Sequence, residues 1–401
     1  MKQTPYISVG TSYYKNVKAP TIAGHFNEIL VHWNMETIKH DHGKNHISKI
    51  PKYDGFTCMP SHLNFQQEFL GFYNVYSPLG KLPKEGDVSL SLKFVKHIFG
   101  NHFELGLDYL QLLYKSPIQI LPILCLISKE RSTGKSTFLK WLKEIFENNL
   151  TYLTNDSFGS QFNADWANKL LICVDEVLFN KEELTERIKY LSTTNIHKLE
   201  AKGKDKHEVE FFGKFILCSN NEESFIKIDA NETRFWVIKV PVLEEEDTSF
   251  LENLITEIPA FMHFLGNRTI SSKRLTRMWF TPQQIKTKAL VKLVRNNRNR
   301  VEKELASVLL SVIEKFDLQA VHLCPMDALL ALNKTRVKTD LTQLRRLLKR
   351  DWKLSNQDNS NSYQKFVIWT DGEINLIDAK GRYFTVEKTF LTQNFDESMT
   401  D

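Results

Sequence analysis

Residues 130–137 read ERSTGKST, and this segment constrains the fold of the chain more than any other. An apolar run at 120–127 precedes it, and residues 138–146 after it carry apolar side chains at helical spacing. A strand, a polar loop ending in Gly-Lys-Ser and a helix are the context of a phosphate-binding loop. The backbone N–H groups of such a loop point at nucleotide phosphates. We therefore predict a nucleotide-binding loop at this position.

In such a loop we expect Lys135 to reach the β- and γ-phosphate oxygens and the Ser136 hydroxyl to bind Mg²⁺. The residues expected to contact ATP are Ser132, Thr133, Gly134, Lys135, Ser136 and Thr137. The pattern G-x-x-x-x-G-K-[ST] begins with glycine, and this chain has Lys129 there. Ser132 stands where such loops usually have a small residue, often glycine, and serine there costs little unless its backbone needs a positive φ. The alternative is a chance GKS segment that enters an ordinary helix.

A second short apolar run, residues 168–174, ends in the carboxylates Asp175 and Glu176. Such a run between polar residues is typical of a buried parallel strand. We expect Asp175 to hold Mg²⁺ together with Ser136, and Glu176 to orient and deprotonate the attacking water. Carboxylates at strand ends are common, but this pair lies about forty residues after Lys135, the usual place of a Walker B motif.

A third apolar run, 211–218, is followed by Ser219-Asn220-Asn221. If its strand lies beside the first two, Asn220 can donate a hydrogen bond to the γ-phosphate or to the attacking water. A simple turn is the alternative, because Asn favours turns. Arg234 precedes one more apolar run. An arginine there could enter the site of a neighbouring subunit and stabilise transition-state charge, and the alternative is a surface ion pair.

Between the carboxylates and the asparagine, residues 197–210 have strand-like flanks around Lys-Gly-Lys. This pattern predicts a β-hairpin with a basic tip. Inside a ring of subunits, lysines on this hairpin would meet DNA phosphates. The residues expected to bind DNA are Lys198, Lys202, Lys204 and Lys206. The alternative is a solvated hairpin.

The order of these five segments resembles superfamily 3 helicases, in particular the poxvirus-type primase-helicase proteins of phages, plasmids and bacterial mobile elements. The resemblance covers about residues 107–241. It implies an α/β fold with an AAA+ P-loop NTPase core that assembles as a homo-hexamer and moves on single-stranded DNA during replication. ATP and Mg²⁺ are the implied cofactors. The implied catalytic residues are Lys135, Asp175, Glu176, Asn220 and Arg234.

The rest of the chain is expected to form smaller parts around this motor. We expect a small N-terminal domain at 1–105, the motor at 106–245, a basic helical linker at 246–300, a winged-helix-like domain at 301–370 and a tail at 371–401. The N-terminal part has neither the length nor the carboxylate pattern of a primase site. A separate primase or replication protein is therefore an expected partner.

The C-terminal part shows three helical patterns, beginning near Glu304, Pro325 and Asp340. Two strands are expected after them, at 352–354 and 365–369. Three helices and a hairpin are typical of a winged helix. Its recognition helix would carry the basic residues Arg345, Arg346, Lys349 and Arg350. Such a domain also serves in protein contacts, so both roles stay open.

Charge is unevenly placed along the chain, although the net charge is only +5. From Pro259 to Arg300 there are ten Lys or Arg residues and no Asp or Glu. A basic block of this length suits a polyanion such as DNA or RNA. The alternative is a solvated helical face, which is the usual meaning of a charge run considered alone.

Other features exclude several classes of protein. No stretch approaches the roughly eighteen consecutive apolar residues of a membrane span, and no secretory signal is recognised. The widely separated cysteines suit a reduced protein, so we expect the cytoplasm of a bacterial host. Five histidine and cysteine residues near the N-terminus are candidate zinc ligands, but their spacing matches no standard template. Those candidates are His40, His42, His46, Cys58 and His62.

Two rival functions remain on sequence grounds. The first is an AAA+ replication initiator or loader, which spends ATP on remodelling DNA or a partner without processive unwinding. The second is a DNA-binding module with a vestigial phosphate loop, suggested only by Lys129.

Overall fold

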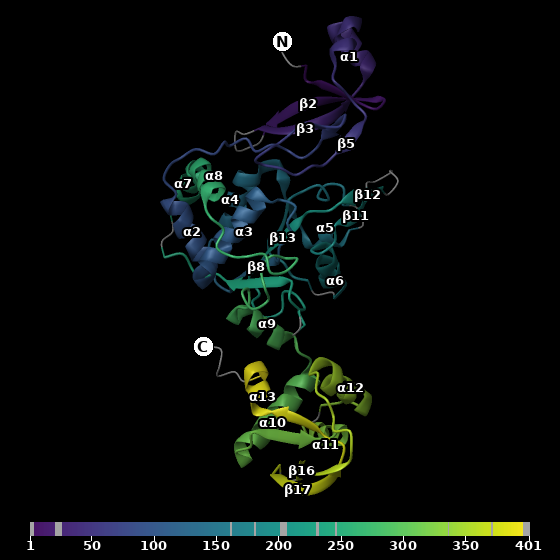
Figure 1. Ribbon diagram of the computed structural model, residues 1–401, viewed down its shortest axis with the longest axis vertical. Helices are drawn as coiled ribbons and strands as arrows, with labels where there is room; N and C mark the ends of the chain where they lie inside the picture. Colours follow the sequence, from purple (N-terminus) through teal and green to yellow (C-terminus); the bar gives the residue numbers. More distant parts are fainter. Residues whose placement is uncertain are drawn as a thin grey trace. The chain divides into compact units, whose positions relative to one another are not determined.

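The computed structural model describes residues 4–20, 26–160, 163–179, 182–200, 207–229, 232–244, 247–335, 337–369 and 372–395. The chain divides into two compact units (Figure 1). The first comprises 1–226 and 233–287, and the second comprises 227–232 and 288–401.

The first unit begins with two small β-sheets. The strands β1 (Tyr6–Val9), β2 (Ser12–Pro20), β3 (Phe26–Trp33) and β4 (Lys52–Tyr53) pair in the order β3-β2-β1-β4. Helix α1 (Met35–His42) and the 3₁₀ helix η1 (Lys44–Lys49) lie between β3 and β4 in sequence, and Tyr6, Ile38 and Ile50 form a small core. The second sheet contains β5 (Gly55–Thr57), β6 (Glu68–Phe69) and β7 (Phe72–Asn74) in the order β5-β7-β6.

A parallel sheet forms the centre of the first unit. Within the described residues its order is β14-β8-β13-β10-β9, and every neighbouring pair is parallel. The strands are β8 (Ile123–Ile127), β9 (Leu150–Leu153), β10 (Leu171–Val174), β13 (Lys214–Ser219) and β14 (Phe235–Lys239). Every residue of β8, β10 and β13 is buried, which is why β8 and β10 are apolar throughout and β13 is apolar between Lys214 and Ser219. The carboxyl ends of parallel strands meet at one edge of the sheet, and this edge positions the site described below.

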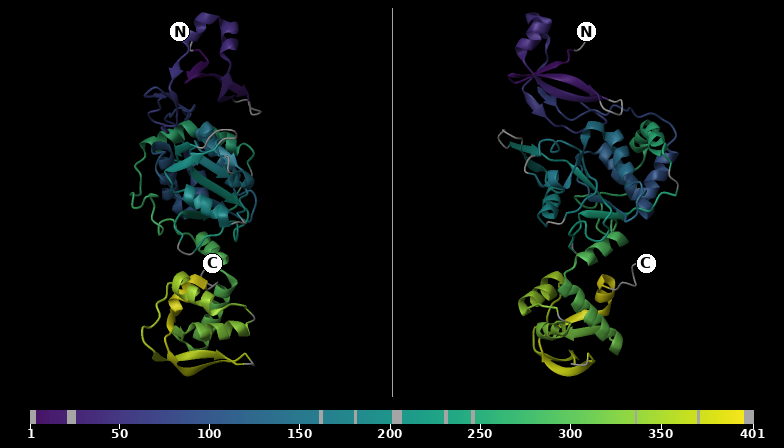
Figure 2. Two further views of the ribbon diagram at one scale, coloured as in Figure 1. Left: turned by 90° about the vertical axis from the view of Figure 1, so that its right-hand side faces the viewer. Right: turned by 180° about the vertical axis from the view of Figure 1, so that it is seen from behind.

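Helices pack against this sheet and complete the core, which contains the buried side chains Phe138, Trp141 and Trp236. After α1, the described helices of the unit are α2 (Ser89–Phe99), α3 (Phe103–Lys115), α4 (Lys135–Phe146), α5 (Asn155–Gly159), α6 (Glu182–Leu191), α7 (Phe250–Thr256) and α8 (Ile258–Asn267), with short 3₁₀ turns at Gly100–His102 and Glu147–Asn149. A hairpin of β11 (Ile196–Leu199) and β12 (His207–Glu210) lies on the side of the unit opposite α2, α7 and α8 (Figures 1 and 2).

The second unit combines helices with two antiparallel strand pairs. Its elements are α9 (Lys288–Asn297), α10 (Arg300–Phe316), β15 (Ala320–Leu323), α11 (Pro325–Lys334), α12 (Leu341–Arg346), a π-helical turn (Leu347–Asp351), β16 (Asn361–Ile368), β17 (Ile374–Gly381), β18 (Phe384–Glu387) and α13 (Lys388–Phe395). Strand β16 pairs with β17, and β15 pairs with β18. The β16–β17 hairpin lies at the end of this unit away from α9 (Figure 2).

Two expectations for the C-terminal part are wrong. Residues 352–354 form no strand, and the partner of β16 is β17, which comes later in the chain. Residues 374–395 are therefore not a loose tail, because Phe384, Val386 and Leu391 are buried in one core with α10. Strand β17 is hard to recognise in the sequence, since its residues, INLIDAKG, mix apolar and polar types and none of them is buried.

None of the described helices combines the length and the apolar composition that a membrane span requires.

Candidate functional site

The loop between β8 and α4 has the backbone conformation of an anion cradle. Gly134 adopts a φ of +83°, and a Cβ added there would approach the Phe94 ring to 3.1 Å. Both the left-handed backbone and the close contact therefore require glycine at this position. Ser132 also has a positive φ, +53°, which costs a serine on the order of 1 kcal/mol. Strain of this kind persists where the surrounding structure enforces it, which suits a site that must hold its amide groups in fixed directions.

Neighbouring elements hold this loop in place. The ring of His97 on α2 forms a hydrogen bond of 3.0 Å to the Thr133 carbonyl oxygen. The Leu243 N–H donates to the Ser132 carbonyl at 3.0 Å. The loop is thus clamped from α2 on one side and from the segment after β14 on the other.

The backbone and the contacts of Lys129 explain why this loop needs no glycine at the first position of the phosphate-loop pattern. Its backbone takes no positive φ, so glycine is not required there. Its N–H donates to Glu222 Oε1 at 2.9 Å, and its ammonium pairs with Glu223 at 2.9 Å. Both glutamates lie in the turn after β13. The missing first glycine is therefore accommodated by a contact between the loop and the segment that carries Asn220.

Glu222 is a site-supporting residue that sequence reasoning missed. Only 4% of it is exposed, and besides accepting the Lys129 N–H its carboxylate forms an ion pair with the Lys239 ammonium at 3.2 Å. These contacts join the loop after β8, the turn after β13 and strand β14. Nothing in the sequence distinguishes Glu222 from Glu223 beside it, because only burial separates them.

We expect Glu222→Ala to destabilise the first unit by about 1–2 kcal/mol, since the partly buried Lys129 N–H loses its acceptor and the half-exposed Lys239 ammonium loses its ion-pair partner. The measurement is urea unfolding of the full chain followed by tryptophan fluorescence. Glu223→Ala is the matched control, because its ion pair with Lys129 is about half exposed on both sides and should contribute less than about 1 kcal/mol. Equal unfolding midpoints for the two variants would contradict the role given to Glu222.

Lys135 is the first residue of α4 and is buried, with 6% of its surface exposed. Its ammonium donates to Thr133 Oγ1 at 3.0 Å and lies 3.5 Å from the Ser128 carbonyl oxygen. Burial lowers the pKa of this ammonium, and nearby acidic groups including Asp175 act in the opposite direction. The hydrogen-bond partners of the buried ammonium are neutral oxygens, so a phosphate group beside Lys135 would provide an anionic partner for it.

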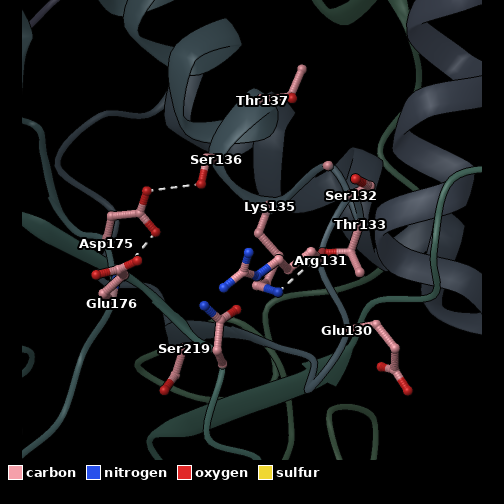
Figure 3. A pocket seen from close by; sticks show the side chains of 12 residues that line it. Glu130, Arg131, Ser132, Thr133, Lys135, Ser136, Thr137, Asp175, Glu176 and Ser219 are labelled. Carbon is pink, nitrogen blue, oxygen red and sulfur yellow. Dashed lines mark hydrogen bonds between the residues drawn. The ribbon is translucent and has the colours of Figure 1, made fainter. Parts of the chain in front are cut away.

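Ser136 and Asp175 come together across the site. The Ser136 hydroxyl donates to Asp175 Oδ2 at 2.9 Å, as Figure 3 shows. Asp175 follows the last residue of β10, and Glu176 follows with a φ of +58°. Both carboxylates are exposed to the cavity, so they are free to meet a cation or a water molecule. A hydroxyl paired with a carboxylate is an oxygen-ligand set of the kind that Mg²⁺ uses with substrate phosphates.

Asn220 lies beside these groups because β13 runs between β8 and β10. The Ser128 N–H donates to the Ser219 carbonyl at 3.2 Å, which ties the ends of β8 and β13 together. The Ser219 hydroxyl donates to the Val177 carbonyl at 2.9 Å, so this side chain braces the turn after β10 and is not free to bind phosphate.

All these groups line one cavity of about 340 Å³ (Figure 3). Its lining comprises Glu130, Arg131, Ser132, Thr133, Gly134, Lys135, Ser136, Thr137, Asp175, Glu176, Ser219 and Asn220. The structure thus brings together every residue expected to bind ATP or Mg²⁺. Glu130 and Arg131 are additions that the sequence motif did not single out.

A second, larger cavity of about 900 Å³ adjoins the same loop. Ser132, Gly134 and Thr137 line both cavities. The apolar side chains of the second cavity come from α2, from the segment after β14 and from α7, and include Leu90, Phe94, Val242, Leu243 and Phe250. Concave apolar surface next to a phosphate loop suits a flat, weakly polar ring.

Arg234 lies at the other edge of the sheet. Its carbonyl oxygen accepts the Ile123 N–H at 2.8 Å, at the start of β8, whereas the loop follows the end of β8. The length of β8 separates the two, roughly 15 Å. Because this exceeds an extended arginine side chain, Arg234 does not reach the cavity of its own chain.

The structure describes only one of the four hairpin lysines that are expected to bind DNA. Lys198 lies on β11, whereas Lys202, Lys204 and Lys206 lie outside the described residues. The base of the hairpin is held by Asn163, which is 2% exposed. Its side chain donates to the Lys198 carbonyl and accepts the Glu200 N–H, both at 2.8 Å. The hairpin is therefore anchored to the segment before β10, which carries Asp175 and Glu176 at its end.

The basic block at 259–300 is divided between the two units, and at least two of its ten cations are engaged in ion pairs. It spans the boundary between the two units at Thr287. The Arg268 guanidinium pairs with Asp108 and with Glu104, and it is nearly buried. Arg298 pairs with Glu302 at 2.7 Å, and both are nearly buried. At least these two cations stabilise the fold and are not available to a polyanion.

The histidines and the cysteine considered for zinc are engaged elsewhere. Among the described residues, no group of three or more His, Cys, Asp and Glu side chains is arranged to hold a metal ion. The rings of His42 and His46 stack on each other, 4.7 Å between centroids. His62 is hydrogen-bonded to the Tyr114 carbonyl and the Tyr76 hydroxyl, and Cys58 donates to the Asn168 carbonyl. Burial lowers the pKa of His62 to about 4, so it stays neutral.

Comparisons with known proteins bear on the fold. Residues 126–234, which include the loop, both carboxylates, Asn220 and Arg234, match a family described as being of unknown function (DUF5906). No curated protein matches the chain.

Among solved structures, the chain is similar to the apo structure of the NrS-1 C terminal region (305-718), with a TM-score of 0.64, 15% identity and 95% of each chain covered. A second form of that region gives a TM-score of 0.61 at 16% identity, covering 93% of this chain and 94% of the other. A JCV helicase structure matches with a TM-score of only 0.28 at 10% identity, which carries no argument. The chain therefore has the fold of the NrS-1 C terminal region along almost its whole length.

Proposed function

We propose that this protein is an ATP-dependent DNA helicase that acts in replication of a phage, plasmid or mobile element. One observation carries the proposal. A single cavity at the carboxyl edge of a parallel sheet collects Lys135, the Ser136–Asp175 pair, Glu176 and Asn220. Together these groups supply what hydrolysis of a nucleoside triphosphate needs, namely a cation for the phosphates, a Mg²⁺ site, a base for water and a polar contact near the γ-phosphate.

ATP would occupy both cavities around the loop. The triphosphate fits the polar cavity, where the loop N–H groups and Lys135 meet its oxygens, and the adenine fits the apolar cavity beside Phe94. Ser136 and Asp175 would hold Mg²⁺, and phosphate oxygens and water would complete its shell. Mg²⁺ held there would neutralise the charge that develops on the phosphates.

The position of Arg234 supports a ring in which subunits share sites. Because this residue lies at the far edge of the sheet from its own cavity, it can serve ATP hydrolysis only in a neighbouring subunit. In a homo-hexamer of AAA+ type, Arg234 of one subunit would face Lys135 and Glu176 of the next. Lys198, Lys202, Lys204 and Lys206 would then contact single-stranded DNA in the ring.

The second unit would act as a winged-helix domain. Its element order, α10-β15-α11-α12-β16-β17, gives three helices, a long hairpin and a basic third helix. The side chains of Arg345, Arg346, Lys349 and Arg350 are exposed. Priming would come from a separate protein, and the site of action would be the cytoplasm of a bacterial host.

The test is ATP hydrolysis by the full chain, with and without single-stranded DNA, followed by strand separation on a forked duplex. DNA-stimulated hydrolysis together with unwinding supports the helicase. Absence of any hydrolysis in both conditions would leave only a DNA-binding module with a vestigial loop.

A second candidate is a replication initiator or loader with the same ATPase. The observation in its favour is the exposed basic helix on a separate unit, since an initiator must hold duplex DNA while it remodels an origin. Hydrolysis that is indifferent to single-stranded DNA, with no separation of a forked duplex, would favour this candidate.

A further inference from the structure

Arg131 is a cation of the phosphate cavity that the loop motif does not explain. It occupies a variable position of the pattern, yet it lines the cavity together with Lys135, Asp175 and Glu176. Figure 3 shows its side chain extending from the loop into the cavity, on the way from Thr133 toward the side where Asp175 and Glu176 lie. A solvated loop arginine would instead extend away from the cavity.

The guanidinium of Arg131 is unpaired in the part of the chain that the structure describes, where it forms neither a hydrogen bond nor an ion pair. This is notable because three carboxylates line the same cavity. Glu130 is held by the Ser128 hydroxyl at 2.8 Å, and Asp175 is held by the Ser136 hydroxyl. Arg131 and the buried Lys135 thus present two positive groups to one space, an arrangement that an anion would stabilise.

No other arginine lines this cavity among the described residues. Arg234 directly precedes β14, at the edge of the sheet opposite the cavity, so in its own chain it cannot take the same place. A guanidinium is planar and offers several N–H groups, which matches the oxygens of a phosphoryl group better than an ammonium does.

We propose that Arg131 contacts the γ-phosphate of ATP bound in the same subunit and stabilises the transition state of its hydrolysis, an inference that rests on the proposed ATPase. The end of the cavity near Thr133, Gly134 and Lys135 holds the β-phosphate, because the loop N–H groups and the helix N-terminus are there. The end near Asp175 and Glu176 holds the γ-phosphate and the attacking water. Arg131 reaches toward that second end.

In the reaction, the water oxygen forms a bond to the γ-phosphorus while the bond to the β,γ-bridging oxygen breaks. Glu176 accepts the proton of the water, and ADP leaves with the electron pair of the broken bond. Negative charge grows on the bridging oxygen, and charge spreads over the γ-oxygens. Arg131 donates its N–H groups to those oxygens, so each subunit supplies one arginine to its own site, and Arg234 supplies a second one to the neighbouring site.

The first experiment compares Arg131→Gln, Arg131→Lys and the control Lys129→Gln as full chains. Lys129→Gln also removes one positive charge from the loop, but its side chain pairs with Glu223 outside the cavity. We expect kcat for ATP to fall on the order of 10²-fold in Arg131→Gln and less in Arg131→Lys, with wild-type kcat in Lys129→Gln. Affinity for ADP should change by less than about 3-fold, because ADP lacks the γ-phosphate.

A kcat for Arg131→Gln within about 3-fold of the wild type would overturn the inference and leave the ATPase standing. A wild-type chain without hydrolysis, with and without DNA, would instead refute the proposed function and this inference with it. Retained ADP affinity and an unchanged melting temperature show that a loss of kcat is not a loss of folding.

A second experiment separates the two arginines by mixing subunits. Arg234→Ala mixed with Lys135→Ala should regain activity, because some sites pair an intact cavity with an intact Arg234. Arg131→Gln mixed with Lys135→Ala should regain none, because every cavity then carries a defect of its own. Recovery in the second mixture would show that Arg131 acts on a neighbour, and would overturn its assignment to the same subunit.

Discussion

ATP hydrolysis by Lys135→Ala is expected to fall at least about 10³-fold relative to the wild type. The ammonium of Lys135 is buried and held by Thr133 Oγ1, so it is positioned before the nucleotide binds and loses no further freedom when it meets the phosphates. Alanine removes the charge and leaves Thr133 without its partner. The measurement is steady-state release of phosphate at saturating ATP and Mg²⁺, with and without single-stranded DNA.

The folding of Lys135→Ala must be checked as well, because the buried Lys135 side chain is hydrogen-bonded to Thr133 and to the Ser128 carbonyl within the loop. Circular dichroism and thermal melting of Lys135→Ala beside Lys129→Gln serve this purpose. A folded Lys135→Ala protein that still hydrolyses ATP at more than a tenth of the wild-type rate would refute the assignment of this cavity.

Glu176→Gln is expected to keep ATP binding while hydrolysis falls on the order of 10²- to 10⁴-fold, the contribution typical of a general base. Glutamine has the shape of glutamate and can still hold the water, but it cannot accept a proton. The side chain is exposed in the cavity at the end of β10, next to the carboxylate that faces Ser136. After passage through a desalting column, the variant should retain unhydrolysed ATP, whereas the wild type should retain ADP or nothing.

Glu223→Gln is the matched control for this result, since it neutralises an exposed carboxylate that pairs with Lys129 and lies outside the cavity. Wild-type turnover in that control together with trapped ATP in Glu176→Gln would support the role of Glu176. Multiple turnovers by Glu176→Gln at the wild-type rate would mean that another group activates the water.

The parallel sheet was readable from the sequence because each of its central strands is buried on both faces. Within residues 120–127, 168–174 and 211–218 lie the uninterrupted apolar segments 123–127, 170–174 and 215–218, and each forms most or all of a strand of the sheet. Strand β17 was missed for the opposite reason, since its residues mix apolar and polar types and none of them is buried. Its pairing with β16 depends on a core that also contains β18 and α13.

The roles of charged residues also could not be predicted from the sequence. Arg268 and Arg298 resemble the other cations of the basic block in sequence, but each has a buried or nearly buried carboxylate partner supplied by the fold. Glu222 and Glu223 are neighbours of identical type, and only one of them is buried against the loop. Arg131 occupies a position that the loop motif leaves open, and its direction into the cavity belongs to the folded loop.

The sequence by itself determined the chemistry of the candidate site, because the phosphate loop, the two carboxylates and the asparagine each follow an apolar strand directly, and local order along the chain carries that information. Only the tertiary structure decided which charges serve the site and which serve the core. Burial and pairing between residues far apart in sequence depend on how the strands and helices pack, and the energy of a charge depends on that environment more than on its neighbours in the chain.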